Sequence, residues 1–484
     1  MTANLPFDPG RIEPFRASLK RLPGYPAGEE LPIRRMVFES GAVFRLPELL
    51  AEAGAQPQAP VLVVMDETPM RRGDDELKPL ILAHLQTAGW LPEAVWLTPD
   101  GSGQVHADMA QVGRVQASLR PGASVLSIGS GTATDIAKHA AHLYAEAGAA
   151  PLPLVAYQTA NSVNAFTSRT ASVFVEGVKR TLASRYIDLL VCDLETLRDS
   201  PAVLTAAGVG DVVASLSSLA DWYLQHRLGL DSDYSELAEA MMGPFDQILL
   251  GHAEAVRARS LEGMEVLAKL LTLGGLAMSL SHSTAPMSGV EHGISHLMDS
   301  LSTLAHRPLA LHGLQVGLAS VLTTETFRIL LEEFEPAELD LSRCYPTAAQ
   351  MKHRLREVLD SVDPTGQASA ECQPAFMAKL QAWHEHRADF ESALRDWPSV
   401  QAGIRARVRP PEVVADILKA VDAPPSFDRL QPPLDEAQVK FAYINAPFVR
   451  RRAMLCDLLL FINWDAETLW ARSNAKFKRL MAGG

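Results

Sequence analysis

The sequence predicts an α/β domain over residues 1–197 and an all-helical domain over residues 198–484. Three observations support this prediction. A chain of 484 residues is too long for one compact core. Short apolar runs alternate with helical segments up to about residue 195, which predicts a parallel sheet covered by helices. From Pro201 onward the pattern is mostly helical, so we expect the second domain to be built from helices.

The expected elements follow from the spacing of the apolar residues. A continuous apolar run, typical of a strand that is buried on both faces, lies at 60–66, and further strands are expected at 93–99, 124–130, 153–159 and 187–193. Helical spacing predicts helices of the first domain over 76–88 and 107–119 and directly after residue 130. In the second domain we expect helices over 204–228, 234–256, 260–281, 289–305 and 311–333.

Composition and charge limit the classes of partner. The chain carries 57 acidic and 44 basic residues, a net charge of −13, whereas nucleic acids and anionic membranes bind basic surfaces. We therefore expect a small-molecule substrate, no nucleic acid and no membrane partner. The four cysteines show no C-x-x-C spacing and suit a reducing compartment.

The absence of recognisable targeting signals predicts a cytoplasmic location. The first fifteen residues contain no basic segment followed by an apolar core, so we expect no signal peptide. No uninterrupted apolar run reaches the ~20 residues that cross a bilayer. The longest candidate, AMLCDLLLFINW, is interrupted by Asp457 and predicts a buried helix.

A glycine-rich turn joins the expected strand at 124–130 to the helix that follows. It reads Gly129-Ser130-Gly131-Thr132. Small residues let the backbone approach a phosphate, and a helix N-terminus offers N–H groups and a partial positive charge. The alternative is a tight turn without a ligand, because the fragment lacks the full G-x-G-x-x-G pattern. Asp66 ends an earlier strand, where it could bind a ribose hydroxyl or cap a loop.

Three polar residues of the helical domain have the chemistry of metal ligands. Asp211 follows two glycines at the start of a helix, His292 and His296 lie four residues apart on one helix face, and His312 begins the next helix. Two imidazoles and a carboxylate suit a catalytic divalent metal with an open coordination position. The spacing also allows ordinary structural roles, in which Asp211 and His312 cap helices or turns and the histidine pair is a surface feature.

Six motifs, in this order along the chain, resemble the sn-glycerol-1-phosphate dehydrogenases. They read GSGTATDIAK, TANSVNAFTSRTA, GVKRT, AGVGD, SGVEHGISH and LHGLQVG. These enzymes are a branch of the iron-containing alcohol dehydrogenase and dehydroquinate synthase superfamily, and the resemblance covers roughly residues 35–335. It implies a dehydroquinate synthase-like fold, in which a Rossmann-like nucleotide domain precedes a helical domain and the active site lies in the cleft between them.

The resemblance also implies a role for each matching residue. Asp211, His292 and His312 fall on the metal ligands. His296 falls where a substrate contact is expected, and Lys179 lies in a segment that could hold the substrate's phosphate. The expected nucleotide contacts are Asp66, Gly129, Ser130, Gly131, Thr132, Asp135, Thr159, Ser162 and Ser168.

Two positions depart from the pattern of the resembled family. Asn164, a candidate catalytic residue, stands where an aspartate is usual, and an amide cannot carry a proton at neutral pH. Ala285 stands where an arginine is usual, so a charge that could recognise a phosphorylated substrate is missing. The chain also continues beyond residue 335 for longer than the resemblance implies, as a C-terminal extension whose role the sequence does not indicate.

The resemblance implies hydride transfer between NADH or NADPH and a small ketone or aldehyde, with dihydroxyacetone phosphate as the typical substrate. It further implies a homodimer and one divalent metal ion, for which we expect zinc, with iron or nickel as alternatives. Two other functions remain open: a dehydroquinate synthase-like lyase that regenerates its cofactor, and a homologue that binds nucleotide and metal without turnover. Such lyases typically use glutamate and two histidines as ligands, so Asp211 favours the dehydrogenase.

Overall fold

The computed structural model describes residues 5 and 7–482, which divide into two compact units. The first unit contains Met1–Val175, Arg180–Val212 and Glu236–Leu280, and the second contains Glu176–Lys179, Val213–Ser235 and Ser281–Gly484. The expectation about a signal peptide falls partly on residues 1–4 and 6, which lie outside the described residues.

This division differs from the expected boundary at residues 197–198. The helical pattern does begin there, but α7 (Ala202–Val212), α10 (Phe245–Arg257) and α11 (Leu261–Leu280) belong to the first unit. The reason is that α11 packs against α7, α6 (Leu194–Asp199) and the 3-10 helix η2 (Ala165–Thr167), which are all parts of that unit. A helical pattern identifies a helix, but it does not identify the surface against which the helix packs.

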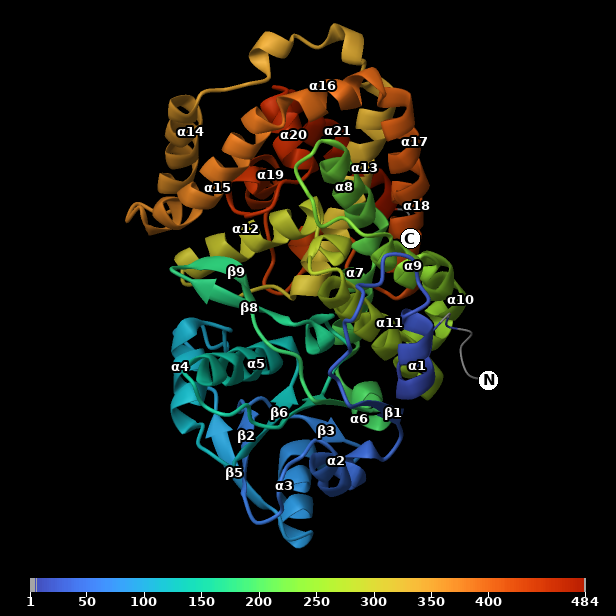
Figure 1. The fold of residues 1–484 in the computed structure, drawn as a ribbon, viewed down its shortest axis with the longest axis vertical. Coiled ribbons are helices and arrows are strands. Elements are labelled where there is room, and N and C mark those ends of the chain that lie inside the picture. Colours follow the sequence, from blue (N-terminus) through green and yellow to red (C-terminus); the bar gives the residue numbers. More distant parts are fainter. Residues whose placement is uncertain (1–4, 6, 483–484) are drawn as a thin grey trace. The chain divides into compact units, whose positions relative to one another are not determined.

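A six-stranded parallel sheet forms the centre of the first unit, as the apolar runs predict (Figure 1). In spatial order its strands are β1 (Arg35–Glu39), β10 (Leu189–Asp193), β7 (Leu154–Gln158), β6 (Ser124–Gly129), β2 (Pro60–Met65) and β5 (Leu91–Trp96). Five of the six overlap the expected runs. β1 was not expected from the sequence, because a charged residue stands at each end of this short strand.

The strand order reverses at β2. From β2 the chain moves outward to the edge strand β5 and then returns to β6 on the other side of β2. β2 and β6 pair with Val64 opposite Ser127, and the same register continued by two residues sets Asp66 opposite Gly129. In open α/β sheets, ligands bind outside the carboxyl ends of the strands at such a reversal. The sheet therefore brings Asp66 and the glycine turn to one edge of the first unit.

Helices cover the sheet. Alternate strand residues point to opposite faces, and Val61, Val63 and Leu126 form an apolar cluster with α2 (Leu46–Glu52) and α3 (Leu77–Thr87). On the other side of the sheet, α5 (Gly131–Glu146) packs on β6 and β7 and against α4 (Met109–Ser118) (Figure 1). The smaller elements in this part of the chain are α1 (Ile12–Leu19), η1 (Ala42–Arg45), β3 (Arg71–Arg72), β4 (Asp75–Glu76), α9 (Glu236–Met242) and the two-stranded sheet of β8 (Thr170–Val175) and β9 (Val178–Ala183).

The second unit is built from helices, as expected. They are α8 (Ser215–Arg227), η3 (Ala285–Met287), α12 (Val290–Leu304), α13 (His312–Glu333), η4 (Pro336–Glu338), η5 (Leu341–Arg343), α14 (Ala348–Asp360), α15 (Gln367–Glu385), α16 (Arg387–Arg395), α17 (Trp397–Arg407), α18 (Pro411–Ala420), η6 (Phe427–Arg429), α19 (Glu436–Asn445), η7 (Ala446–Phe448), α20 (Leu455–Phe461) and α21 (Ala466–Met481). The expected helix over 204–228 is divided into α7 and α8, and that over 234–256 into α9 and α10 at Gly243 and Pro244.

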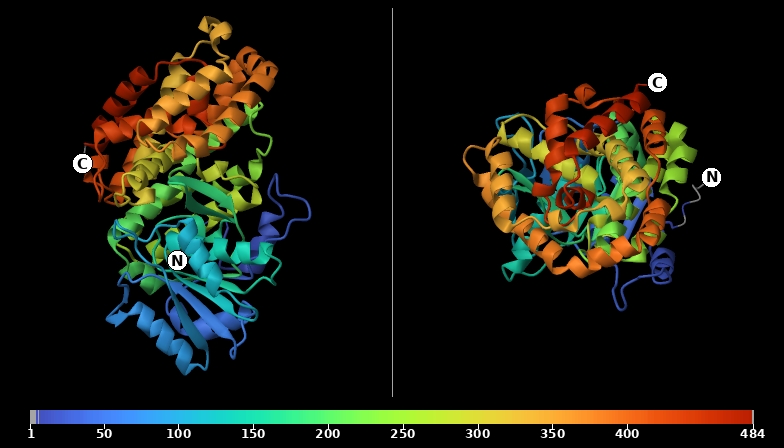
Figure 2. Two further views of the ribbon diagram at one scale, coloured as in Figure 1. Left: turned by 90° about the vertical axis from the view of Figure 1, so that its left-hand side faces the viewer. Right: turned by 90° about the horizontal axis from the view of Figure 1, so that it is seen from above.

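The C-terminal extension, residues 336–482, is part of the core of this unit. α13 packs against α18 and α21 of the extension, and α12 packs against α19. Figure 2 shows the orange and red helices of the extension beside the yellow helices of the same unit. α20 is the buried helix that AMLCDLLLFINW predicts. Removing the extension would therefore expose the apolar faces of α12 and α13.

Three helical segments are long and apolar enough to cross a membrane, which corrects the expectation that none would be. They are Ala202–Arg227, Leu261–Leu280 and His312–Glu333, and 83%, 94% and 94% of their most apolar windows are buried inside the protein. Polar and charged residues interrupt these segments, so a search for uninterrupted apolar runs misses them. Their burial against other helices accounts for their hydrophobicity.

Candidate metal and nucleotide site

The glycine turn is tightly packed where it leaves β6. A Cβ added at Gly129 would lie 2.6 Å from the Cβ of Ala133, and one added at Gly131 would lie 2.5 Å from Val163 Cγ2. Both glycines are therefore required by the packing of the turn itself. Among the described residues no side chain caps the helix at Ser130, so the first turn of α5 is suited to an anionic ligand.

Asp66 makes the contacts of a loop cap, which was one of its two expected roles. Its carboxylate accepts from Lys78 Nζ at 2.7 Å, from the backbone N–H of Thr68 at 3.1 Å and from the Thr68 hydroxyl at 3.0 Å. About a quarter of the Asp66 side chain is exposed. A carboxylate has about four acceptor positions, so these bonds leave it able to accept from a ribose hydroxyl as well.

The other expected nucleotide residues lie mostly in buried loops of the first unit. Asp135 accepts from the backbone N–H of Ser172 at 3.1 Å and lies 3.1 Å from the ammonium of Lys138. Lys138 donates to the backbone oxygen of Ser168 at 2.9 Å, and burial lowers the pKa of its ammonium although Asp135 opposes this shift. Asp135 therefore fixes α5 to residues 165–172 from within. Thr159 and Ser162 are buried just beyond the end of β7.

Asp211 lies on α7 where this helix meets the loop after β7. A Cβ added at Gly208 would lie 2.1 Å from the backbone oxygen of Asn161, so only glycine allows the helix to come this close. Three residues further along, Asp211 Oδ2 accepts from the backbone N–H of Asn164 at 2.7 Å. Asn164 is buried, and its side-chain Nδ2 has no hydrogen-bond partner in the described part of the chain. Gly208, the first glycine of AGVGD, thus sets the position of the Asp211 carboxylate.

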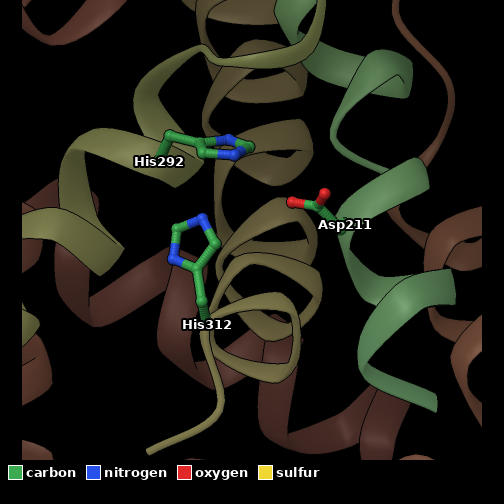
Figure 3. Close-up of side chains that lie close together, drawn as sticks. All are labelled: Asp211, His292 and His312. Carbon is green, nitrogen blue, oxygen red and sulfur yellow. The ribbon is translucent and has the colours of Figure 1, made fainter. Parts of the chain in front are cut away.

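Asp211, His292 and His312 lie close together, as the sequence analysis expected (Figure 3). Each offers one ligand atom, and these atoms all lie within 4.8 Å of one another. Figure 3 shows the carboxylate facing the two imidazole rings, whose centroids are 5.2 Å apart. Two nitrogens and one oxygen at this spacing fit a divalent metal ion with a further coordination position.

Hydrogen bonds orient both imidazoles. His292 donates through Nδ1 to Glu291 Oε1 at 3.1 Å, and His312 Nδ1 lies 3.0 Å from Ser295 Oγ. Ser295 in turn donates to Gln315 Oε1 at 3.3 Å, so its oxygen accepts the proton of His312 Nδ1. Each Nε2 is then left with a lone pair. Metal-bound histidines usually have such a partner on the second ring nitrogen. The hydrogen bonds of Glu291 and Ser295 therefore fit a metal site, in addition to the three ligand residues themselves.

His296 and Lys179 lie in the same unit and extend this network. The centroid of the His296 ring is 5.5 Å from that of His312. Lys179 Nζ donates to Asp299 Oδ2 at 2.6 Å, and Gln315 Nε2 donates to Asp299 Oδ1 at 2.7 Å, which links Lys179 to the His312 partners. Burial, and then the positive charges of Arg450 and Lys179, lower the pKa of His296 well below its ordinary value. His312 is shifted in the same direction by burial and by Lys179.

Five residues of this network were not predicted from the sequence: Glu291, Ser295, Asp299, Gln315 and Arg450. Glu291, Asp299 and Gln315 each stand within three residues of an expected site histidine. Helical spacing from His296 and His312 could have found Asp299 and Gln315, whereas Glu291 directly precedes His292. Arg450 comes from the C-terminal extension and donates to His296 Nδ1 at 3.0 Å. No local pattern signals it, because the contact joins residues 154 positions apart.

Comparison with known proteins agrees with the motifs. The family model for iron-containing alcohol dehydrogenases matches residues 37–201. The glycerol-1-phosphate dehydrogenase (NAD(P)+) of Bacillus subtilis (strain 168) is 32% identical over 259 residues, which are 52% of this chain and 64% of that enzyme. The enzyme of the same name from Bacillus licheniformis is 29% identical over 303 residues, 62% of this chain and 72% of the relative. Over the matched residues the chain is similar to the iron-containing alcohol dehydrogenases.

This chain matches only part of the length of the glycerol-1-phosphate dehydrogenases. The chain spans just under two thirds of the Bacillus subtilis enzyme and about half of a third enzyme of that name, from Pyrococcus furiosus, which is 32% identical over 197 residues. The family model ends before Asp211, His292 and His312. Their roles therefore rest on the geometry of this chain.

Solved structures confirm the expected fold. A probable glycerol dehydrogenase from Sinorhizobium meliloti 1021 has a TM-score of 0.55 at 15% identity, covering 93% of this chain and 98% of that chain. A sulfoacetaldehyde reductase from Bifidobacterium kashiwanohense, in complex with NAD+, has a TM-score of 0.52 at 13% identity, covering 92% of this chain and 97% of that chain. At these identities the likeness concerns the fold alone, and it matches the expected α/β part followed by a helical part.

Proposed function

We propose that this chain is a metal-dependent dehydrogenase that transfers a hydride between NAD(P)H and the carbonyl carbon of a small ketone or aldehyde. The observation that carries the proposal is the spacing of Asp211, His292 and His312, whose ligand atoms lie within 4.8 Å of one another. Such a ligand set leaves a coordination position for a substrate oxygen. The names of the curated relatives support the reaction class and the cofactor.

A divalent cation bound by these residues would polarise a carbonyl oxygen, and a reduced nicotinamide would supply the hydride. The residues of the chain do the rest. Glu291 and Ser295 hold the two imidazoles with a lone pair on Nε2. The glycine turn and Asp66 would bind the dinucleotide at the edge where the strand order reverses. Asp211 and His292 are buried, which excludes bulk water from the reacting groups.

For the substrate we propose dihydroxyacetone phosphate or a close analogue, as the names of the relatives suggest. Lys179 and Arg450 bring positive charge to the histidines, since both lower the pKa of His296 and His312. Positive charge of this kind favours an anionic substrate. Asn164 cannot supply the proton that completes the reduction, which leaves His296, a water chain or a ribose hydroxyl to do so.

Metal content tests the ligand assignment directly. The purified chain should hold about one divalent ion, zinc by expectation, and His292→Ala should lose it because a site with two remaining ligands binds far more weakly. His353→Ala, at an exposed histidine of α14, is the matched control and should retain the ion. Full occupancy in His292→Ala would remove His292 from the ligand set.

A substrate panel tests the reaction. Absorbance of NADH and NADPH should fall with dihydroxyacetone phosphate and less readily with unphosphorylated ketones. Absorbance that changes and then recovers within one turnover would indicate the lyase instead. Nucleotide binding without turnover on any ketone or aldehyde would indicate a homologue that has lost catalysis. Sizing of the same preparation tests the expected homodimer.

A further inference from the structure

One arginine of the C-terminal extension lies beside the histidines of α12. Arg450, Arg451 and Arg452 follow each other in the loop between η7 and α20. Arg450 is buried, with 7% of its surface exposed, and donates from Nη1 to His296 Nδ1 at 3.0 Å and from Nη2 to Ser288 Oγ at 2.7 Å. The side chain of its neighbour Arg451 is 61% exposed. The same short loop therefore contains a buried arginine on the site and an exposed one away from it.

The loop that carries Arg450 is fixed at both ends. Lys379 Nζ donates to the backbone oxygen of Pro447 at 2.5 Å and to Asp457 Oδ1 at 2.6 Å, before and after the three arginines. The backbone N–H of Leu455 donates to Asp221 Oδ1 at 2.7 Å. These bonds lie within the second unit, so the packing of the extension itself holds the guanidinium in place.

Glycine in the EHGISH segment lets this loop approach α12. A Cβ added at Gly293 would lie 3.0 Å from Met454 Cε and 3.4 Å from the Cβ of Ala446. Gly293 lies between His292 and His296 in the sequence. The close approach therefore occurs on the stretch of helix that carries both histidines.

Donor and acceptor rules then decide the protonation of His296. A guanidinium has only N–H donors, so His296 Nδ1 must accept from Arg450. A ring that accepts at Nδ1 cannot be an imidazolium, and its single proton is on Nε2. His292 and His312 are the opposite tautomer, because Glu291 and Ser295 accept the proton of Nδ1. Three neighbouring histidines thus divide into two with a lone pair on Nε2 and one with a proton there.

We propose that Arg450 is a positioning residue, which holds His296 neutral with its proton on Nε2 and so makes it a hydrogen-bond donor to the substrate oxygen. This assignment also accounts for the i, i+4 histidine pair, in which only His292 has a lone pair on Nε2 for a metal. The role toward substrate rests on the proposed function. The tautomer of His296 does not, since it follows from hydrogen bonds of this chain alone.

The tautomer can be measured without activity. The full-length chain with ¹⁵N-labelled histidine is prepared with added Zn²⁺, and His296→Gln assigns the His296 signals among those of the 14 histidines. In the wild-type chain we expect Nδ1 of His296 without a proton and Nε2 with one. Arg450→Met should shift the ring toward the other tautomer, Arg450→Lys should keep the original one because an ammonium also only donates, and Arg451→Met should change nothing.

Kinetics tests whether the tautomer matters. Arg450→Met should lower kcat about tenfold to a hundredfold, the usual effect of removing a partner of a site histidine, while Arg450→Lys recovers most of this loss and Arg451→Met has wild-type kcat. A proton on Nδ1 of His296 in the wild-type chain overturns the proposal, even if Arg450→Met does not fold. An unchanged tautomer or an unchanged kcat in Arg450→Met also overturns it. A chain with the expected tautomer and no dehydrogenase activity would refute only the proposed function.

Discussion

Single residues of the candidate site owe their properties to partners that lie outside the expected motif positions. Glu291 shows this most clearly. Full burial acts to raise the pKa of its carboxyl group, but the hydrogen bonds from His292 and from backbone N–H donors outweigh burial and place the pKa below its ordinary value. Ser217 Oγ donates to the same carboxylate at 2.9 Å. A buried negative charge next to His292 keeps the proton on Nδ1 and makes Nε2 a better ligand.

Glu291→Gln should weaken metal binding by about tenfold to a hundredfold with little change in fold, because glutamine has the same shape without the charge. Competition with a chelator, monitored by metal content, measures the affinity. Glu338→Gln, at an exposed glutamate of η4, is the control. Equal affinities of wild type and Glu291→Gln would show that the carboxylate has no part in holding a metal.

At the level of elements, Gly208 sets how closely α7 approaches the loop after β7. Gly208 is part of the AGVGD motif, which the sequence analysis connected with metal binding through Asp211 alone. The structure adds a packing role, because the helix backbone at Gly208 leaves no room for a Cβ against Asn161. The carboxylate of Asp211 then reaches the backbone N–H of Asn164. A larger separation between the helix and the loop would lengthen and weaken that bond.

Gly208→Ala should lower the free energy of unfolding by about 1–3 kcal/mol, since the added methyl group meets backbone that cannot move aside. It should also weaken metal binding, because α7 carries Asp211. Gly113→Ala is the matched control, as Gly113 lies in α4 with nothing within 4 Å of an added Cβ. There alanine should stabilise the helix by about 0.5–1 kcal/mol. Urea unfolding of both variants would contradict this account if the two substitutions had the same effect.

At the level of the whole molecule, the C-terminal extension and α8 share a set of buried charges. Lys379 pairs with Asp457 at 2.6 Å, and both side chains are almost fully buried. Asp221 of α8 accepts from the backbone N–H of Leu455 at the start of α20. Burial raises the pKa of Asp221 to about 7, although the nearby charge of Arg452 acts in the opposite direction. A carboxyl group with such a pKa connects the stability of the second unit to pH.

The folded chain should lose stability between about pH 4 and pH 7 through Asp221. This group binds its proton more tightly when folded than when unfolded, so its contribution is fully present below the unfolded pKa and is lost as the pH rises through the folded value. A shift from 3.8 to about 7 corresponds to about 4 kcal/mol as an upper estimate. Asp221→Asn carries no charge, so its stability relative to wild type should rise over the same pH range.

Urea unfolding at several pH values tests this prediction. Asp360→Asn, at an exposed aspartate of α14, should follow the wild-type curve at every pH. Curves for wild type and Asp221→Asn that stay parallel from pH 4 to pH 8 would show that Asp221 does not cause the pH dependence.

Some features of this protein could be predicted from the sequence because they depend on neighbours in the chain. Five of six sheet strands, the glycine turn and the main helices follow from local apolar spacing, and the ordered motifs pointed to Asp211, His292 and His312. The tertiary structure alone decided three other things: that 236–280 belongs to the first unit, that the extension forms part of a core, and that Arg450 lies on His296. These depend on which buried surfaces and hydrogen-bonding groups meet across long separations in the chain. Apolar periodicity carries no information about such partners, since any complementary surface satisfies it equally well.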